Sequence, residues 1–250
     1  MPGSTSITQL QAEARRELKA AGDPRIAAQA RVYFKPDEKV RFYGVNAPTA
    51  RKIARGLSAR VRGAWGLDEA MAFCEAMLRE PEAEAKSVGI LVLADFKRQF
   101  DGTMARTIEG WLEEGLCADW ATTDGLCMSV LGPLLGIHPE LVAKLRGWTR
   151  RRSLWLRRAS AVPLTYYARR GRHLDEVYEI AEALFDYPED LIHKANGWLL
   201  RDAGKTDPAR LEAFLLAHGP RIPRTTIRYA IEKFPPARRK TLLACTRSTN

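Results

Sequence analysis

The chain has 250 residues, 46% of them hydrophobic, which is enough to bury a substantial core. No run approaches the roughly 20 apolar residues of a membrane helix, and the N-terminal MPGSTSITQL lacks the charged and apolar regions of a signal peptide. The 40 lysines and arginines exceed the 30 aspartates and glutamates, so the net charge is +10 and a polyanionic partner is favoured. We expect a globular, cytoplasmic protein with no membrane segment.

The cysteines and histidines form no pattern typical of a metal site or a disulfide framework. No cysteine has a partner at C-x-x-C spacing, and the histidines are scattered singly. A lone residue of either kind is more often a small buried group or a surface group than a ligand. We therefore predict no metal site. The residues are Cys74, Cys117, Cys127, Cys245, His138, His173, His193 and His218.

Helical periodicity dominates the chain, and strand-like alternation is nearly absent. Apolar residues recur at three and four positions in several segments, with Asp, Ser or Pro near their starts. The clearest segments are 8–22, 48–61, 67–80 and 173–185. Glycine and proline predict breaks that leave about a dozen short helices. The predicted breaks are Gly22, Pro81, Gly132, Pro188 and Pro223. These patterns predict an all-α chain.

The basic residues gather in two segments. Residues 141–174 contain no Asp or Glu but many Lys and Arg, and residues 221–247 are also basic, with Glu232 as their only acid. A solvated charged face explains one such run more easily than two. The first segment is therefore a candidate phosphate-binding surface.

Three segments repeat a basic residue one or two positions before a small alanine. They are WLRRASAV, IHKANGWL and TIRYAIEK, and their alanines Ala159, Ala195 and Ala230 lie 36 and 35 residues apart. This period suits a helical-hairpin repeat. We predict a single HEAT-like α-solenoid domain over residues 1–250, and the sequence leaves open whether residues 1–6 are ordered. The basic residues of the repeats, which would form a stripe on its concave surface, are Arg157, Arg158, Lys194 and Arg228.

Such solenoids most often grip a protein or peptide, so a protein scaffold remains an alternative. The basic stripe favours nucleic acid, because a curved basic groove suits a duplex, and helical repeats also read single-stranded RNA. A further discriminator is needed.

A tryptophan and an aspartate in DWATTDGL are placed to act together. Trp120 and Asp124 are four positions apart, so they share one face of a continuous helix. Two alternatives stay open, in which Trp120 is a core residue and Asp124 is an exposed turn residue before a glycine. Arg158 and Trp198 follow in successive repeats about 35 to 40 residues apart, and repeat geometry could bring the four together.

At these residues the chain resembles the AlkD family of DNA alkylation-repair glycosylases, which are built from HEAT-like repeats. The resemblance extends over most of the chain and rests on four ordered matches. They are ARVYFKPDEKVRFYGVNAPTARKIA, the pair Trp120 and Asp124, WLRRAS with Arg158 and Ser160, and IHKANGWLLRDAGKTDP around Trp198.

The resemblance implies roles for these residues. Trp120 and Trp198 would flank the sugar and backbone of a damaged nucleotide. Asp124 would be catalytic, and Arg158 would grip the phosphate beside it.

Further DNA contacts are implied at Tyr33, Arg51 and Arg201. The segment 33–44 is longer than in the family pattern, and Ala47 stands where a hydroxyl residue is common. The N-terminal segment therefore departs from the family pattern at these two points.

The expected substrate determines which catalytic groups the site needs. A purine alkylated at N3 or N7 is cationic and leaves with little help, while the sugar develops positive charge that a carboxylate and aromatic faces stabilise. No lysine is placed as a Schiff-base nucleophile. We predict a monofunctional glycosylase without a cofactor, acting as a monomer on double-stranded DNA that contains alkylated purines and leaving an abasic site. The alternatives are a noncatalytic HEAT-like nucleic-acid-binding protein and a protein scaffold.

Overall fold

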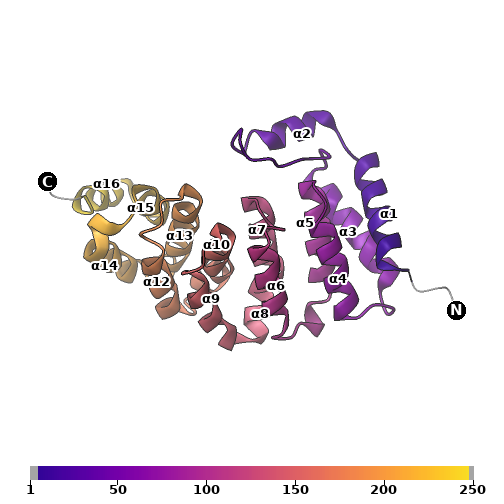
Figure 1. Cartoon of the computed structure of the whole chain (residues 1–250). Coiled ribbons are helices and arrows are strands. Elements are labelled where there is room, and N and C mark those ends of the chain that lie inside the picture. Colours follow the sequence, from indigo (N-terminus) through magenta and orange to yellow (C-terminus); the bar gives the residue numbers. More distant parts are fainter. Residues whose placement is uncertain (1–4, 248–250) are drawn as a thin grey trace. The chain divides into compact units, whose positions relative to one another are not determined.

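The computed structural model describes residues 5–247, and in this range it confirms the all-α prediction (Figure 1). The one extended pairing in the described range is an isolated bridge between Arg41 and Glu82. Of the segment 1–6, residues 1–4 lie outside the described range, whereas Thr5 and Ser6 are placed. The Ser6 side chain accepts a hydrogen bond from the Gln9 backbone and caps the first helix.

The chain divides into two compact units, Met1–His138 and Pro139–Asn250, and each is described by itself. The prediction of a single domain stays untested. The helical elements of the first unit are α1 (Ile7–Ala20), α2 (Pro24–Arg31), α3 (Ala47–Val61), α4 (Leu67–Leu78), α5 (Ala83–Ala94), η1 (Lys97–Gln99), α6 (Met104–Glu113), α7 (Trp120–Leu126), the π-helical η2 (Cys127–Leu131) and α8 (Gly132–Ile137).

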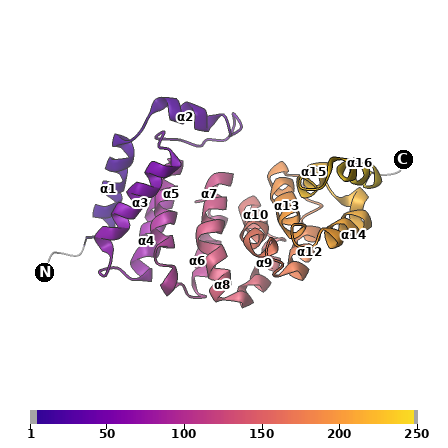
Figure 2. The same ribbon diagram turned by 180° about the vertical axis from the view of Figure 1, so that it is seen from behind.

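In the first unit, α1, α3, α4 and α5 pack side by side around a common core (Figures 1 and 2). Leu10, Leu57 and Met77 are fully buried there, as helical periodicity predicts. α4 and α5 approach so closely that a Cβ on Gly89 would lie 2.5 Å from the Met77 Cβ. Both views show α2 lying across one end of these helices, with the loop that follows it reaching toward α7.

The break predicted at Gly132 is wrong. Residues 120–137 run through α7, η2 and α8 without interruption, and the Gly132 N–H donates to the Cys127 carbonyl five positions back. Pro133 has no N–H and its ring would clash with the preceding turn of a regular α-helix. A π-helical turn directly before the proline widens the helix, and the chain continues.

The second unit is built around α13. Its elements are η3 (Pro139–Leu141), α9 (Val142–Trp148), α10 (Leu154–Ala161), η4 (Val162–Leu164), α11 (Thr165–Ala168), α12 (Leu174–Ala183), α13 (Asp190–Ala203), α14 (Pro208–His218), η5 (Gly219–Arg221), α15 (Arg224–Ala230) and α16 (Pro236–Cys245). α13 packs against α10, α11, α12 and α15. The regularly spaced Ala159, Ala195 and Ala230 lie in α10, α13 and α15 and are buried. Whether the repeats are HEAT-like stays a prediction.

In the described range no single helix is long and apolar enough to cross a membrane. One bent pair of helical segments, residues 120–137 and 139–148, meets the length and composition criteria for a membrane span, and no other observation on the described residues supports such a span.

Candidate functional site

The start of α7 is fixed by a buried aspartate. Asp119 accepts hydrogen bonds from the Thr122 backbone N–H and the Thr122 hydroxyl, both at 2.7 Å. The Thr123 hydroxyl donates to the Cys117 carbonyl, also at 2.7 Å. The bond from the Thr122 N–H satisfies one of the donors that a helix N-terminus leaves open, and the two hydroxyl bonds hold the first turn in place, so the helix begins at Trp120.

Trp120 and Asp124 lie on one face of α7, as predicted. At 3.6 residues per turn, four positions separate two side chains by about 40° around the axis. Both residues are half-buried. The alternative in which Asp124 occupies an exposed turn is wrong, because α7 continues to Leu126.

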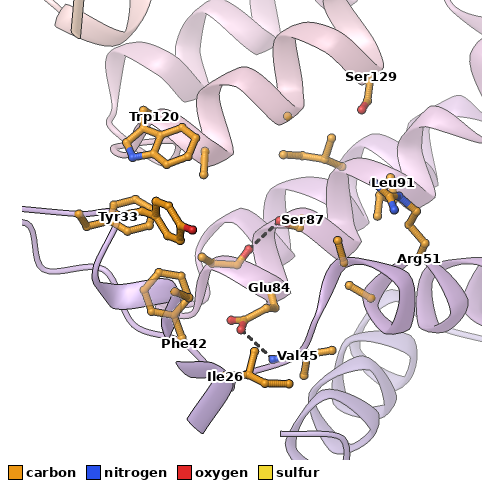
Figure 3. Close-up of a pocket in the computed structure, with 18 residues that line it drawn as sticks. Ile26, Tyr33, Phe42, Val45, Arg51, Glu84, Ser87, Leu91, Trp120 and Ser129 are labelled. Carbon is orange, nitrogen blue, oxygen red and sulfur yellow. Dashed lines mark hydrogen bonds between the residues drawn. The ribbon is translucent and has the colours of Figure 1, made fainter. Parts of the chain in front are cut away.

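A cavity of about 450 Å³ opens beside Trp120 within the first unit. Its walls come from α2, the loop after it, α3, α5 and α7 (Figure 3). Tyr33 and Trp120 lie on one side of the cavity and Arg51 on the other. Three residues predicted from the sequence therefore line a single cavity. Other lining residues are Ile26, Phe34, Phe42, Glu84, Leu91 and Ser129.

Aromatic contacts hold Trp120 against the loop that follows α2. The ring of Phe34 stacks on the indole of Trp120, with 5.3 Å between ring centroids and 21° between planes. Phe42 packs on the same Phe34 ring at 5.4 Å. Tyr33 points outward beside this cluster and is 77% exposed. A buried ring therefore supports Trp120, while its neighbour Tyr33 remains available to a ligand.

Glu84 anchors the returning end of the same loop. This carboxylate is buried at the start of α5 and accepts backbone N–H bonds from Tyr43, Gly44 and Val45 at 3.1, 2.9 and 3.0 Å. Gly44 adopts a positive φ of 85°, which favours glycine at this position. Both carboxylate oxygens of Glu84 therefore accept hydrogen bonds from the loop, although the residue also lines the cavity.

In the second unit, the neighbouring Arg157 and Arg158 are both buried. The Arg157 guanidinium donates to the carbonyls of Arg151 and Arg152 at 3.0 and 2.9 Å, pairs with Glu189, and lies 4.3 Å from the centroid of the Tyr187 ring. These internal partners leave it unsuited to the DNA contact predicted for it. The Arg157 prediction is therefore revised to a structural role.

Arg158 and Lys194 lie close together between α10 and α13. Nη1 of Arg158 donates to the Leu191 carbonyl at 2.5 Å. Lys194 pairs with Asp190 at 2.8 Å, and this hydrogen bond raises the lysine pKa, while burial and the positive charge of Arg158 act in the opposite direction. Lys194 is therefore cationic at neutral pH.

Trp198 is positioned by a buried aspartate one turn along α13. Its indole Nε1 donates to Oδ2 of Asp202 at 3.0 Å, and Lys205 pairs with the other carboxylate oxygen. Asp202 is 3% exposed. Arg201, predicted as a backbone contact, pairs with Glu232, whereas Arg228 is exposed at the end of α15.

Comparison with known proteins identifies the family. The family model described as "DNA alkylation repair enzyme" matches residues 14–234. The chain belongs to the family of DNA alkylation repair enzymes. Among solved structures, a predicted DNA alkylation repair enzyme from Enterococcus faecalis is similar, with a TM-score of 0.75 and 18% identity over 86% of this chain and 97% of that one. At this identity the similarity shows the fold alone. No curated protein matches the sequence significantly.

In this DNA alkylation repair family member, the structure gathers the predicted residues in two groups. Tyr33, Arg51 and Trp120 line the cavity of the first unit. Asp124 lies one helical turn after Trp120 on α7. Arg158, Lys194, Trp198 and Arg201 lie on α10 and α13 of the second, with Arg228 on α15. The joint action of the two groups on one nucleotide stays a prediction.

Sequence reasoning missed four supporting residues of this DNA alkylation repair family member. Asp119 was readable as a helix cap before Trp120, and Asp202 as an i,i+4 partner of Trp198. Phe34 and Glu84 gave no such signal, because their partners lie 86 and about 40 residues away along the chain.

Proposed function

We propose that the protein is a monofunctional DNA glycosylase of the AlkD type, built from HEAT-like repeats. It hydrolyses the N-glycosidic bond of N3- or N7-alkylated purines in duplex DNA and leaves an abasic site. Family membership supports a role in repair of alkylated DNA. One observation carries the more specific assignment: Trp120, which lines an aromatic cavity, shares one face of α7 with Asp124.

The leaving group decides which catalytic groups are needed. Alkylation at N3 or N7 gives the purine a positive charge, so the base departs with the electrons of the glycosidic bond and needs no proton. Positive charge then passes to the deoxyribose, and water adds to the sugar carbon. A site for this reaction needs groups that favour a cation and orient water.

Asp124 is assigned to that cation. A carboxylate about 4 Å from a unit charge gains roughly 4 kcal/mol at an effective dielectric constant of about 20. If that attraction is realised only in the transition state, it corresponds to about a thousandfold in rate. The same carboxylate can orient the attacking water.

The indole faces of Trp120 and Trp198 add to this stabilisation. A cation over an indole is attracted by roughly 0.5 to 2 kcal/mol. Phe34 fixes the Trp120 ring and Asp202 fixes the Trp198 ring, so neither has to be ordered when DNA binds. Arg158 is assigned to the phosphate beside the lesion, and Tyr33 and Arg51 to the DNA backbone.

The test is release of free base from methylated duplex DNA, followed by chromatography. The wild-type protein should release 7-methylguanine or 3-methyladenine, and Asp124→Asn should release almost none while binding DNA at least as well. Asp95→Asn is the matched control, because this exposed carboxylate ends α5 in the same unit. Binding without release by the wild type would instead favour a noncatalytic nucleic-acid-binding protein, and absence of both would favour a protein scaffold.

A further inference from the structure

A cluster of tyrosines and arginines occupies α11 and the turn that leads from it to α12, and we call residues 166–172 the 166–172 turn. It lies in the second unit, in the basic segment 141–174. The Tyr166 ring is 41% exposed. The guanidinium carbons of Arg170 and Arg169 lie 3.7 and 5.2 Å from its centroid, and that of Arg172 lies 5.4 Å from the centroid of Tyr167.

Several other arginines of the same unit are paired with carboxylates, unlike those of this turn. Arg146, Arg210 and Arg221 each lie within salt-bridge distance of a carboxylate. Across residues 5–247, no carboxylate lies within that distance of the three turn arginines, whose cation contacts are with tyrosine rings.

The nearest acids after the turn are already engaged with other groups. Asp175 pairs with Arg210 at 2.5 Å, and Glu179 pairs with Arg146 at 2.8 Å. Glu176 lies 3.7 Å from His173. Three neighbouring positive charges therefore remain without a counter-charge from the described chain, an arrangement that an external anion would stabilise.

The backbone of the turn is held in one conformation. The Tyr167 carbonyl accepts from the N–H groups of Arg170 and Arg172 at 2.9 and 3.1 Å. Gly171 has a positive φ of 71°, and a Cβ there would lie 3.6 Å from the hydroxyl of Thr206, in the turn after α13. The turn thus presents its side chains from a fixed base.

Stacking on tyrosine leaves the guanidinium edges open. A salt bridge uses the N–H groups at the edge of a guanidinium, whereas a cation–π contact uses its flat face. In Arg170, Nη1 donates to the Tyr166 carbonyl at 2.8 Å, and the remaining N–H groups are available. Oriented open N–H groups on an uncompensated cation match the oxygens of a phosphate.

We propose that the 166–172 turn is a phosphate-binding surface for duplex DNA, additional to the residues assigned to the lesion. The surface rests on the proposed DNA partner but not on base excision. Its contribution is independent of sequence and lesion, because phosphates carry no base information. Tyr166 acts as the platform that orients Arg169 and Arg170.

The experiment measures binding of an undamaged duplex oligonucleotide by fluorescence anisotropy over a salt series. The triple variant Arg169→Ala, Arg170→Ala, Arg172→Ala should bind at least about tenfold more weakly, and its log–log salt slope should fall by about 0.9 for each phosphate that the turn no longer neutralises. The control triple variant Arg210→Ala, Arg221→Ala, Arg238→Ala removes three arginines that are paired with carboxylates and makes the same change in net charge on the same unit. It should retain nearly all of the affinity and slope.

Tyr166 separates orientation from charge. Tyr166→Ala leaves the net charge unchanged and should weaken duplex binding several-fold, whereas Tyr166→Phe keeps the ring and should bind like the wild type. Circular dichroism and thermal melting of every variant establish that each is folded.

Several outcomes would overturn the proposal. Unchanged binding by the turn variant is one. Equal losses in both triple variants are another, because net charge alone would then be the cause. The third is a loss of binding to single-stranded RNA with no loss of binding to duplex DNA. Base release by the wild type is measured separately. Failure of that assay with normal turn results would reject the glycosylase proposal alone, while normal release with an unaffected turn variant would reject the phosphate surface alone.

Discussion

The indole N–H of Trp198 donates to Oδ2 of Asp202 at 3.0 Å, one turn further along α13. Asp202 is 3% exposed, and its second oxygen pairs with Lys205. The carboxylate is therefore too buried to meet a DNA strand directly. Its place is behind Trp198, where it fixes the rotation of the indole ring.

This relationship predicts different effects for two substitutions of Asp202. Asp202→Ala removes the acceptor, whereas Asp202→Asn can still accept from the indole. If Trp198 contributes about 0.5 to 2 kcal/mol to the transition state, Asp202→Ala should lower the single-turnover excision rate by about twofold to thirtyfold. Asp202→Asn should stay closer to the wild type. Equal rates for Asp202→Ala and the wild type at saturating enzyme would show that the ring needs no such support.

The stack between Phe34 and Trp120 predicts a second effect. Phe34→Ala removes a buried ring and should destabilise the first unit by about 2 to 4 kcal/mol. This loss is slightly smaller than is usual for a core aromatic residue, because Phe34 lies at the rim of the cavity. Phe34→Leu should recover much of the stability but not the ring contact. Comparing excision by Phe34→Leu with excision by the wild type, below both melting temperatures, tests whether the stack itself matters, and equal rates would limit Phe34 to packing.

Glu84 predicts a third effect, on the loop between α2 and α3. Glu84→Gln keeps the size of the side chain but replaces one acceptor oxygen with an amide that donates. At least one of the three backbone N–H groups loses its partner, which should cost about 1.5 to 3 kcal/mol because the original bond is to a charged group. Thermal melting measures the loss, and limited proteolysis should show faster cleavage within residues 33–44. Asp95→Asn on the same helix should change neither.

Helix periodicity predicted the elements well because local caps agree with the apolar pattern. The segment 48–61 corresponds to α3, Ala47–Val61, which Asn46 caps through the Thr49 N–H at 3.0 Å. The same reasoning gave a wrong prediction at Gly132. A glycine before a proline usually ends a helix, but here a π-helical turn lets the helix continue past both residues. That turn depends on hydrogen bonds whose register the residue types do not determine.

The site was predictable where its residues are local on a helix. The pair Trp120 and Asp124 follows from four-residue spacing alone. Phe34 and Glu84 act through contacts between separate elements, which neither spacing nor composition encodes. Basic composition also failed to separate Arg157 from Arg158, because the burial and partners of each are set by α13 and the segment before it.

Those two arginines predict a contrast. Arg157→Ala should lower the melting temperature, with a loss of about 1 to 3 kcal/mol, because Glu189 and two carbonyls lose their donor. Its salt slope for DNA binding should be unchanged. Arg158→Ala should weaken binding of damaged and undamaged duplex alike and lower the salt slope by about one phosphate contact. Unchanged binding and slope in Arg158→Ala would remove this residue from the DNA interface.

The charge of the lesion provides the last prediction. The proposed site offers stabilisation of a sugar cation through Asp124 and two indoles, but no general acid is assigned to it. Cationic N7-alkylguanine and N3-alkyladenine should therefore be released, because their bases leave without protonation. Neutral lesions such as uracil, hypoxanthine or ethenoadenine need a proton or tight contacts to the base, and they should persist.

The comparison requires single-turnover rates from one enzyme preparation on duplexes of matched sequence, so that binding and product release do not mask the chemical step. Asp124→Asn serves as the blank, because any release it shares with the wild type does not depend on the proposed carboxylate. Rates on uracil comparable to those on 7-methylguanine would contradict the electrostatic account. Such rates would require a proton donor for the leaving base. Asp124 could not be that donor, because a group that must stay ionised to stabilise the sugar cannot also supply the proton, so the donor would be sought among other side chains near Trp120.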